Sequence, residues 1–176
     1  FFVFSVSAWA DIERAFAALE AEDFETAYRE FKPLAEAGNE LAQRNLGVLY
    51  LFGLGVTKST SEGLKWLTKA AEQDDASAQA MLGSLFLNLD EQFEVARDYT
   101  VALGWFRKAA EQKDGQAEFF LGFMHEHGLG VNQDFKEAVK WYTRAAEQGH
   151  ADAQRKLGLL HPVSYTHLRA HETRPN

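Results

Sequence analysis

Two short motifs recur along this chain at a shared interval. A Leu-Gly pair appears four times, at spacings of 36, 39 and 36 residues: Leu46-Gly47, Leu82-Gly83, Leu121-Gly122 and Leu157-Gly158. A tryptophan that precedes Ala-Ala-Glu-Gln by four residues appears three times, at spacings of 39 and 36 residues: Trp66, Trp105 and Trp141. Because two independent landmarks keep the same spacing, the sequence predicts a tandem array of repeats.

Each repeat has the apolar pattern of two helices. The first helix carries an i, i+4, i+7, i+8 stripe, exemplified by Ala42, Leu46, Leu49 and Tyr50. The glycine of each Leu-Gly pair lies inside this helix, where it costs about 1 kcal/mol relative to alanine. We therefore expect these glycines to mark close approaches between helices.

The second helix of each repeat begins with a small residue and then carries the tryptophan and the Ala-Ala pair. We assign Trp66, Trp105 and Trp141 to the core. Gly-Leu-Gly-Val turns at 53–56 and 128–131 separate the two helices and supply residues that tolerate positive φ.

The two ends of the sequence depart from the repeat. Residues 1–10 are apolar and close on Ala8-Trp9-Ala10, the small-residue pattern of a signal-peptidase site, so we interpret them as a truncated signal peptide. A first structural helix or strand is the alternative. Residues 162–176 resemble a translated sequencing adapter and are excluded from the fold, together with His167 and His171.

These observations predict the following organisation. A capping helix pair spans 11–38, followed by repeat 1 at 39–74, repeat 2 at 75–113 with an insertion at 88–98, repeat 3 at 114–149, and the first helix of a fourth repeat at 150–161. Glu30 takes the tryptophan position in the cap, as expected for a terminal unit with a wetter surface.

The motifs resemble those of the Sel-like repeat (SLR) family, whose repeats are related to tetratricopeptide repeats. The family pattern is carried by Leu41–Val56 with Gly63–Asp74, and again by Gln116–Val131 with Ala138–Gly149. The resemblance implies an all-α, right-handed α/α superhelical solenoid and an adaptor or scaffold role. Repeat 2 departs from it, because Asn88–Asp98 replaces the Gly-x-Gly-Val turn and leaves the geometry of that loop open.

Composition excludes several functional classes. The formal net charge is −8, so the chain lacks the basic surplus that nucleic acids or anionic membranes require. The sequence contains no cysteine, which excludes disulfides, thiolate metal ligands and cysteine nucleophiles. We expect no cofactor, no metal, no membrane-spanning segment in the mature chain, and a monomer.

No arrangement of side chains indicates catalysis. His125 and His127 are two residues apart and face different sides of a helix, so packing explains His125 better than metal binding. Some SLR proteins have been linked to β-lactam hydrolysis, but those are cysteine-rich and this chain is not. We therefore expect a non-catalytic protein.

Binding is predicted on the ridge formed by first-helix positions outside the core stripe. In an α/α solenoid this ridge lines the concave face, and the candidate contact residues are Arg44, Val48, Phe119, Phe123 and Arg155. Phe119 and Phe123 are one helical turn apart and suit an aromatic anchor, with Arg44 and Arg155 as carboxylate partners. The alternative is that both phenylalanines pack against the next repeat.

The function predicted from these features is a scaffold or adaptor of the bacterial envelope, periplasmic or secreted, that binds a protein or peptide. Two alternatives remain open at this point. One is a carbohydrate-binding or hydrolase-accessory protein of the envelope, and the other is a cytosolic regulatory repeat protein, which would require residues 1–10 to be structural.

Overall fold

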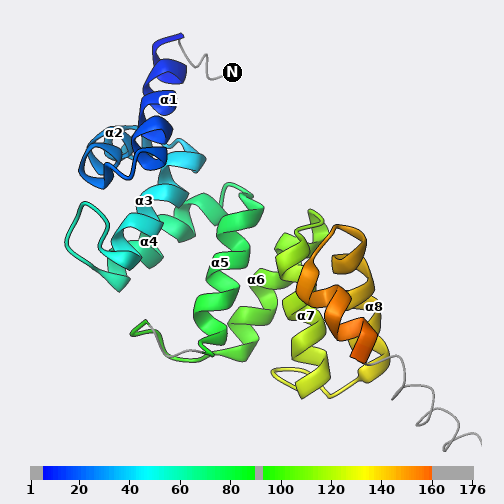
Figure 1. The fold of residues 1–176 in the computed structure, drawn as a ribbon. Coiled ribbons are helices and arrows are strands. Elements are labelled where there is room, and N and C mark those ends of the chain that lie inside the picture. The colour runs from blue at the N-terminus through cyan, green and yellow to red at the C-terminus, as the bar shows by residue number, and fades with distance from the viewer. Residues whose placement is uncertain (1–5, 90–92, 160–176) are drawn as a thin grey trace, which may run out of the picture. The chain divides into compact units, whose positions relative to one another are not determined.

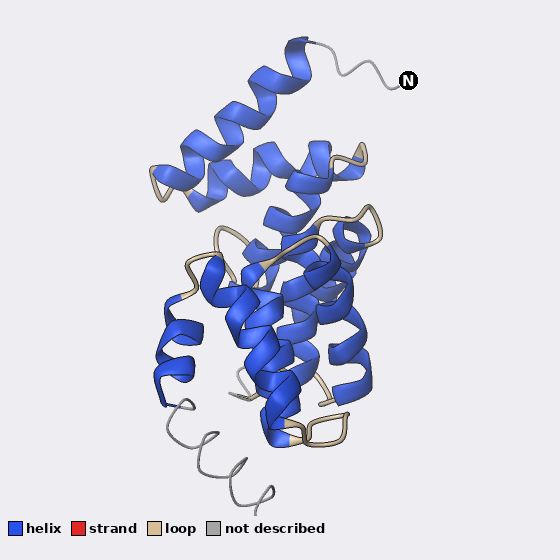
Figure 2. Cartoon of the chain, turned by 90° about the vertical axis from the view of Figure 1, so that its right-hand side faces the viewer, coloured by secondary structure: helices blue, strands red, loops and turns tan. Residues whose placement is uncertain are grey.

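The computed structural model describes residues 6–89 and 93–159, and in these ranges the regular structure is helical, with no strand (Figure 2). The all-α prediction is confirmed. The helices are labelled in Figure 1 and have these bounds: α1 Val6–Glu20, α2 Phe24–Glu36, α3 Glu40–Phe52, α4 Thr60–Ala71, α5 Ala76–Leu87, α6 Tyr99–Glu111, α7 Gly115–His127 and α8 Phe135–Glu147. Residues 151–159 form one further helix.

The helices fall into two compact units that divide after Arg97. In the first unit α1 packs on α2, α2 on α3, α3 on α4, and α4 on α5. In the second unit α6 packs on α7, and α7 packs on α8. In repeats 1 and 3 the first and second helices form an antiparallel pair, α3–α4 and α7–α8 respectively (Figure 1).

Side-chain caps fix where the first helices begin. The side chains of Asn39, Asp75 and Asp114 precede α3, α5 and α7, and each accepts a hydrogen bond from the backbone N–H three residues later, at 2.9, 2.7 and 2.8 Å respectively. Each cap satisfies a backbone donor that the helix leaves unpaired and contributes about 1 kcal/mol. The repeat boundaries therefore have a local physical cause.

Left-handed residues end the same helices. Gly53 (φ 69°) and Gly128 (φ 67°) follow α3 and α7. In repeat 2, where the glycine turn is missing, Asn88 takes this conformation with φ 43°. The Asn88 Nδ2 donates to the Val95 backbone oxygen at 2.6 Å, a hydrogen bond that joins the start of the insertion to residue 95.

The core of each second helix is centred on the residue after the tryptophan. Leu67, Phe106 and Tyr142 are all fully buried. Consecutive helical residues point about 100° apart, so this position and the tryptophan cannot face the core equally. Phe31 holds the equivalent place in α2 and is also fully buried.

The assignment of all three tryptophans to the core is therefore correct only for Trp66, which is 6 % exposed. Trp105 and Trp141 are partly exposed. A cation three residues later lies over each ring, with distances to the ring centroid of 4.3 Å for Lys69 on Trp66, 4.6 Å for Lys108 on Trp105 and 4.6 Å for Arg144 on Trp141. The tryptophans thus lie at the rim of the core, beneath charged side chains.

The helical glycines mark close approaches in two of the repeats. A Cβ added at Gly47 would lie 2.8 Å from the Leu67 Cγ, and one at Gly122 would lie 2.7 Å from the Tyr142 ring. At Gly158 a Cβ would meet no described atom within 4 Å. The prediction that these glycines admit a second helix is confirmed for Gly47 and Gly122. At Gly158 it stays a prediction, since the residues that follow this helix lie outside those described.

Some predictions fall on residues outside those described. These are residues 1–5 of the signal-peptide assignment, 90–92 of the insertion and 160–176, which include the excluded tail. Ala8 to Ala10, the predicted cleavage site, lie within α1. Within the described residues no helix is both long enough and apolar enough to cross a lipid bilayer.

Candidate partner-binding surface

The predicted binding ridge consists of first-helix side chains that lie beside the core stripe. In the first unit it includes Arg44 and Val48 on α3, both half-buried. In the second unit it includes Phe119 and Phe123 on α7 and Arg155 in the 151–159 helix. The two groups belong to separate units and are described separately.

Arg44 is engaged within the first unit. Its Nη1 donates to both carboxylate oxygens of Asp75, at 2.7 and 3.1 Å. Asp75 is also the N-cap of α5 and accepts from the Ala78 N–H. Arg44 therefore connects repeat 1 to the start of repeat 2, and a partner carboxylate would have to compete with Asp75 for its guanidinium.

Phe119 is largely a packing residue of the second unit. Its ring stacks on His150 at a centroid distance of 4.7 Å and an interplanar angle of 11°, and it contacts the Tyr142 ring at 5.5 Å. It packs against the small buried cluster of Ala138, Tyr142, Ala145 and Ala153. Of the two alternatives for Phe119, these contacts favour packing against the next repeat.

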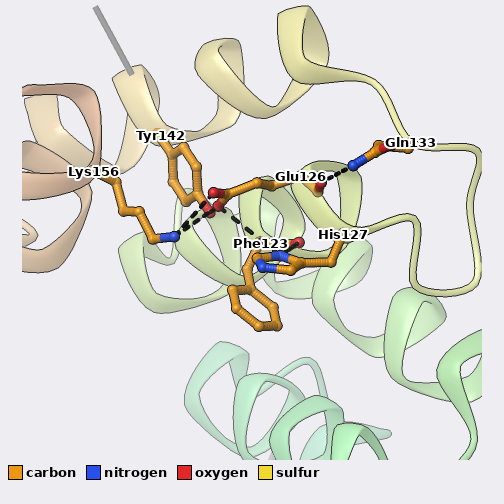
Figure 3. Close-up of polar contacts among 6 residues, drawn as sticks. All are labelled: Phe123, Glu126, His127, Gln133, Tyr142 and Lys156. Carbon is orange, nitrogen blue, oxygen red and sulfur yellow. Dashed lines mark hydrogen bonds and ion pairs between the residues drawn. The ribbon is translucent and has the colours of Figure 1, made fainter. Parts of the chain in front are cut away.

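Phe123 lies in a different environment, shown in Figure 3. Its half-buried ring lies 4.2 Å from the His127 ring, centroid to centroid, and the Lys156 ammonium is 6.0 Å from its centroid. His127 is exposed and its Nδ1 is 2.9 Å from the Phe123 backbone oxygen. This places an aromatic surface beside two nitrogen-bearing side chains.

Glu126 organises the polar side of this cluster (Figure 3). Its carboxylate accepts from the Tyr142 hydroxyl at 2.5 Å and from the Lys156 Nζ at 2.9 and 3.1 Å. Burial raises the pKa of Glu126, but the hydrogen bonds from Tyr142 and Lys156 outweigh it and hold the pKa below the usual 4.5. Burial and the same carboxylate raise the pKa of Tyr142. Lys156 is thus oriented by an ionised partner.

The ridge residue Arg155 and the nearby Leu159 are exposed side chains of the 151–159 helix. Arg155 pairs with Asp152 at 2.7 Å, one helical turn away, and its side chain is 73 % exposed. Such an exposed pair is worth little and leaves the guanidinium available to another carboxylate. Leu159 is 66 % exposed.

The Glu126–Tyr142–Lys156 cluster was not predicted from the sequence, although one sign of it was present. Glu126 occupies the repeat position held by Leu51 and Leu87, which are 4 % and 1 % exposed. A carboxylate at a core position requires a partner. The partner Lys156 is 30 residues away, so it is recognised only once the helices are placed.

The fold and this surface define an α/α repeat protein, built from antiparallel helix pairs that present the sides of their first helices. The Sel1 repeat family matches residues 41–75, 76–114 and 115–150, which is more than half of the chain. The chain belongs to the Sel1 repeat family, and the resemblance seen in the sequence is confirmed.

Solved structures agree with this assignment. A Sel1 repeat protein from Oxalobacter formigenes aligns with a TM-score of 0.76 and 35 % identity, over 85 % of this chain and 59 % of that protein. A protective antigen of uropathogenic Escherichia coli strains that displays an SLR fold aligns with a TM-score of 0.76 and 32 % identity, over 85 % of this chain and 33 % of that protein. The helical-repeat solenoid class is thereby shown.

Among curated proteins, the sel1-like repeat-containing protein L18 of Acanthamoeba polyphaga mimivirus is 39 % identical over 44 residues, which is 25 % of this chain and 8 % of that protein. The chain therefore spans less than two thirds of the length of each of these relatives. Sel1 repeats generally serve as protein-interaction scaffolds.

Proposed function

We propose that this chain is a non-catalytic scaffold of the bacterial envelope that binds a protein or peptide along its first-helix ridge. The observation that carries the proposal is Phe123, an aromatic ring on the ridge that lies between His127 and the Glu126-oriented Lys156. Repeats 1 and 2 have Val48 and Ser84 at this position. Aromatic side chains, phenylalanine included, are enriched at protein–protein interfaces.

The contact residues proposed for the partner are Phe123, Arg155, Phe119, Val48 and Arg44. The internal contacts that each residue already makes determine how readily it can bind a partner. Phe123 and Arg155 can contact a partner without losing an internal bond of the core, whereas Phe119 and Arg44 already hold His150 and Asp75. Val48 offers a small apolar contact on α3.

Site-specific photo-cross-linking tests the surface. A photoreactive residue at 123 or 155 is expected to capture a defined partner in the source bacterium. The matched control is the same residue at position 135, since Phe135 is 52 % exposed at the start of α8 and is not on the ridge. Capture from 135 but not from 123 or 155 would place the binding surface elsewhere. Retention on peptidoglycan in place of a protein would favour the carbohydrate-binding alternative.

The envelope location is a separate part of the proposal and needs its own experiment. It is supported by the Ala8-Trp9-Ala10 pattern. Expression of the complete reading frame in the source organism, followed by fractionation and mass spectrometry, is expected to yield a periplasmic or secreted protein that starts at Asp11. A cytosolic protein that retains residues 1–10 would contradict export and favour the cytosolic regulatory alternative.

A further inference from the structure

The exposed side of α6 lacks a charged pair that the other second helices carry. In α4 and α8 a glutamate and a lysine three residues apart form an ion pair just before the tryptophan, at 3.0 Å for Glu62–Lys65 and 2.7 Å for Glu137–Lys140. In α6 the equivalent residues are Val101, which is half-buried, and Gly104, which is exposed. The partly exposed Trp105 therefore has neither of these charged side chains beside it.

Gly104 does not serve packing among the described residues. A glycine in the interior of a helix lowers its stability relative to other residues. At Gly47, Gly63 and Gly122 the glycine admits a neighbouring helix, since an added Cβ would lie 2.6 to 2.8 Å from a side chain of that helix. At Gly104 a Cβ would meet no described atom within 4 Å. The stability that Gly104 removes from α6 is thus not offset by a close helix contact.

Two exposed cations follow Gly104 on the same side of α6. Arg107 and Lys108 come three and four residues later, which places them one helical turn away. Neither forms an ion pair with a described residue, Glu111 included, and Lys108 contacts only the Trp105 ring, at 4.6 Å from its centroid. In α4 and α8 the position of Arg107 is held by threonine. This side of α6 therefore combines an apolar surface with two cations that can pair with carboxylates.

We propose that the surface formed by Val101, Gly104, Trp105, Arg107 and Lys108, here called the α6 notch, binds an acidic helix of a partner protein. The partner helix approaches most closely at the glycine, as neighbouring helices do at the other three helical glycines. The valine and tryptophan supply apolar contact, and the two cations supply charge complementarity. Because the α6 notch lies on a second helix and the proposed ridge lies on first helices, the two proposals are independent.

Transfer of the charged pair from the other repeats fills the α6 notch and keeps the helix. The double variant Val101→Glu with Gly104→Lys reproduces the arrangement of α4 and α8. It is expected to melt at a higher temperature than the unchanged chain, because it removes a helical glycine and adds an i, i+3 ion pair. Partner binding is expected to fall about tenfold, since the lysine side chain occupies the position of the docked helix.

A second variant alters the charge and leaves the space open. Arg107→Thr restores the residue that α4 and α8 carry at this position. Arg107 is exposed and unpaired among the described residues, so its replacement is expected to leave the melting temperature nearly unchanged. Partner binding is expected to fall about fivefold through the loss of one charge-assisted contact.

Photo-cross-linking in the source organism measures partner binding as the yield of cross-linked product. The photoreactive residue replaces Thr100, an exposed residue four positions before Gly104, and mass spectrometry identifies the cross-linked segment. The matched control position is Lys136, the equivalent exposed residue of α8, where the Glu137–Lys140 pair is present. Capture of another protein through an acidic helical segment is expected from position 100 and not from position 136.

Five outcomes overturn the proposal. They are no capture from position 100, equal capture from position 136, capture through a basic or uncharged segment, capture of a second copy of this chain, and capture that neither the double variant nor Arg107→Thr reduces. Capture from position 123 or 155 tests the first-helix ridge alone, so its failure would leave the α6 notch standing.

Discussion

Arg144 forms an ion pair with Glu118 at 2.7 Å. It also supplies a hydrogen bond that a glutamine makes in the other repeats. Gln43, Gln79 and Gln154 occupy this position elsewhere, and each donates to a backbone oxygen eight residues earlier, at 3.1, 3.0 and 3.2 Å respectively. Glu118 is 1 % exposed and, as a carboxylate, has no proton to donate to Ala110. The Arg144 Nη2 donates to that Ala110 oxygen at 3.3 Å and also pairs with Glu118.

This substitution of one donor for another predicts strong coupling between the two residues. Arg144→Ala is expected to destabilise the chain by about 1–3 kcal/mol, because it leaves a buried carboxylate without its ion pair. In a Glu118→Gln background the glutamine can donate to Ala110, and Arg144→Ala should then cost less than about 1 kcal/mol, mainly the lost contact with Trp141. Urea denaturation of the four variants measures the coupling. Equal costs in both backgrounds would show that Arg144 does not compensate for Glu118.

The residue after the tryptophan is expected to matter more than the tryptophan. Phe106 is fully buried and stacks on Phe120 at 5.1 Å, so Phe106→Ala should cost about 3–5 kcal/mol. Trp105 is partly exposed beneath Lys108, and Trp105→Ala should cost less than half as much. Phe135→Ala, at an exposed phenylalanine, serves as the control and should lie within about 0.5 kcal/mol of the unchanged chain. Thermal and urea unfolding together test the order, and a larger loss at Trp105 would reverse it.

These cases show which parts of the structure the sequence predicts. The repeat interval, the helix pairs and the role of Gly47 and Gly122 follow from local patterns, because each depends on spacing along one or two helices. The rotation of the second helix about its axis does not follow from local patterns, because Trp105 and Phe106 are both large and aromatic and either could fill the core. Only the placed helices show which of the two faces inward.

The candidate site was predictable to a smaller extent for the same reason. Phe123 was found because it differs from Val48 and Ser84 at one repeat position. The pairing of Arg44 with Asp75 and the stacking of Phe119 on His150 join residues 31 positions apart, on different repeats. Such contacts depend on how one repeat stacks on the next, and they leave no periodic pattern in a single sequence from which they could be predicted.

Two helical glycines should respond oppositely to the same change. Gly122→Ala would place a Cβ 2.7 Å from the Tyr142 ring, so the α7–α8 pair must separate, at a cost of about 1–3 kcal/mol. Gly104→Ala adds a methyl group that meets no described atom within 4 Å, and it should stabilise the chain by about 0.4–1 kcal/mol through backbone entropy. Thermal melting of both variants tests this prediction. A change of the melting temperature in the same direction for both would contradict close packing at Gly122.

Acid should weaken the second unit through Glu126. The pKa of this carboxyl is lowered in the folded chain: burial raises it, but the Tyr142 hydroxyl and the Lys156 ammonium stabilise the ionised form more. A lowered folded pKa means that the unfolded chain binds the proton more readily. The stabilisation is therefore complete above the unfolded pKa of about 4.5 and is lost as the pH falls through the lower, folded value.

A Glu126→Gln variant isolates this contribution. Urea unfolding at pH 7 is expected to show a loss of stability relative to the unchanged chain, because Lys156 loses its charged partner and Tyr142 its charged acceptor. The difference between the two chains should shrink as the pH is lowered below about 4.5, since Glu126 then becomes protonated in the unchanged chain. Glu147→Gln is the control, because Glu147 is an exposed carboxylate of the same unit. A difference for Glu126→Gln that stays constant from pH 7 to pH 3 would mean that its charge does not stabilise the cluster, and that Lys156 is positioned by packing on Phe123.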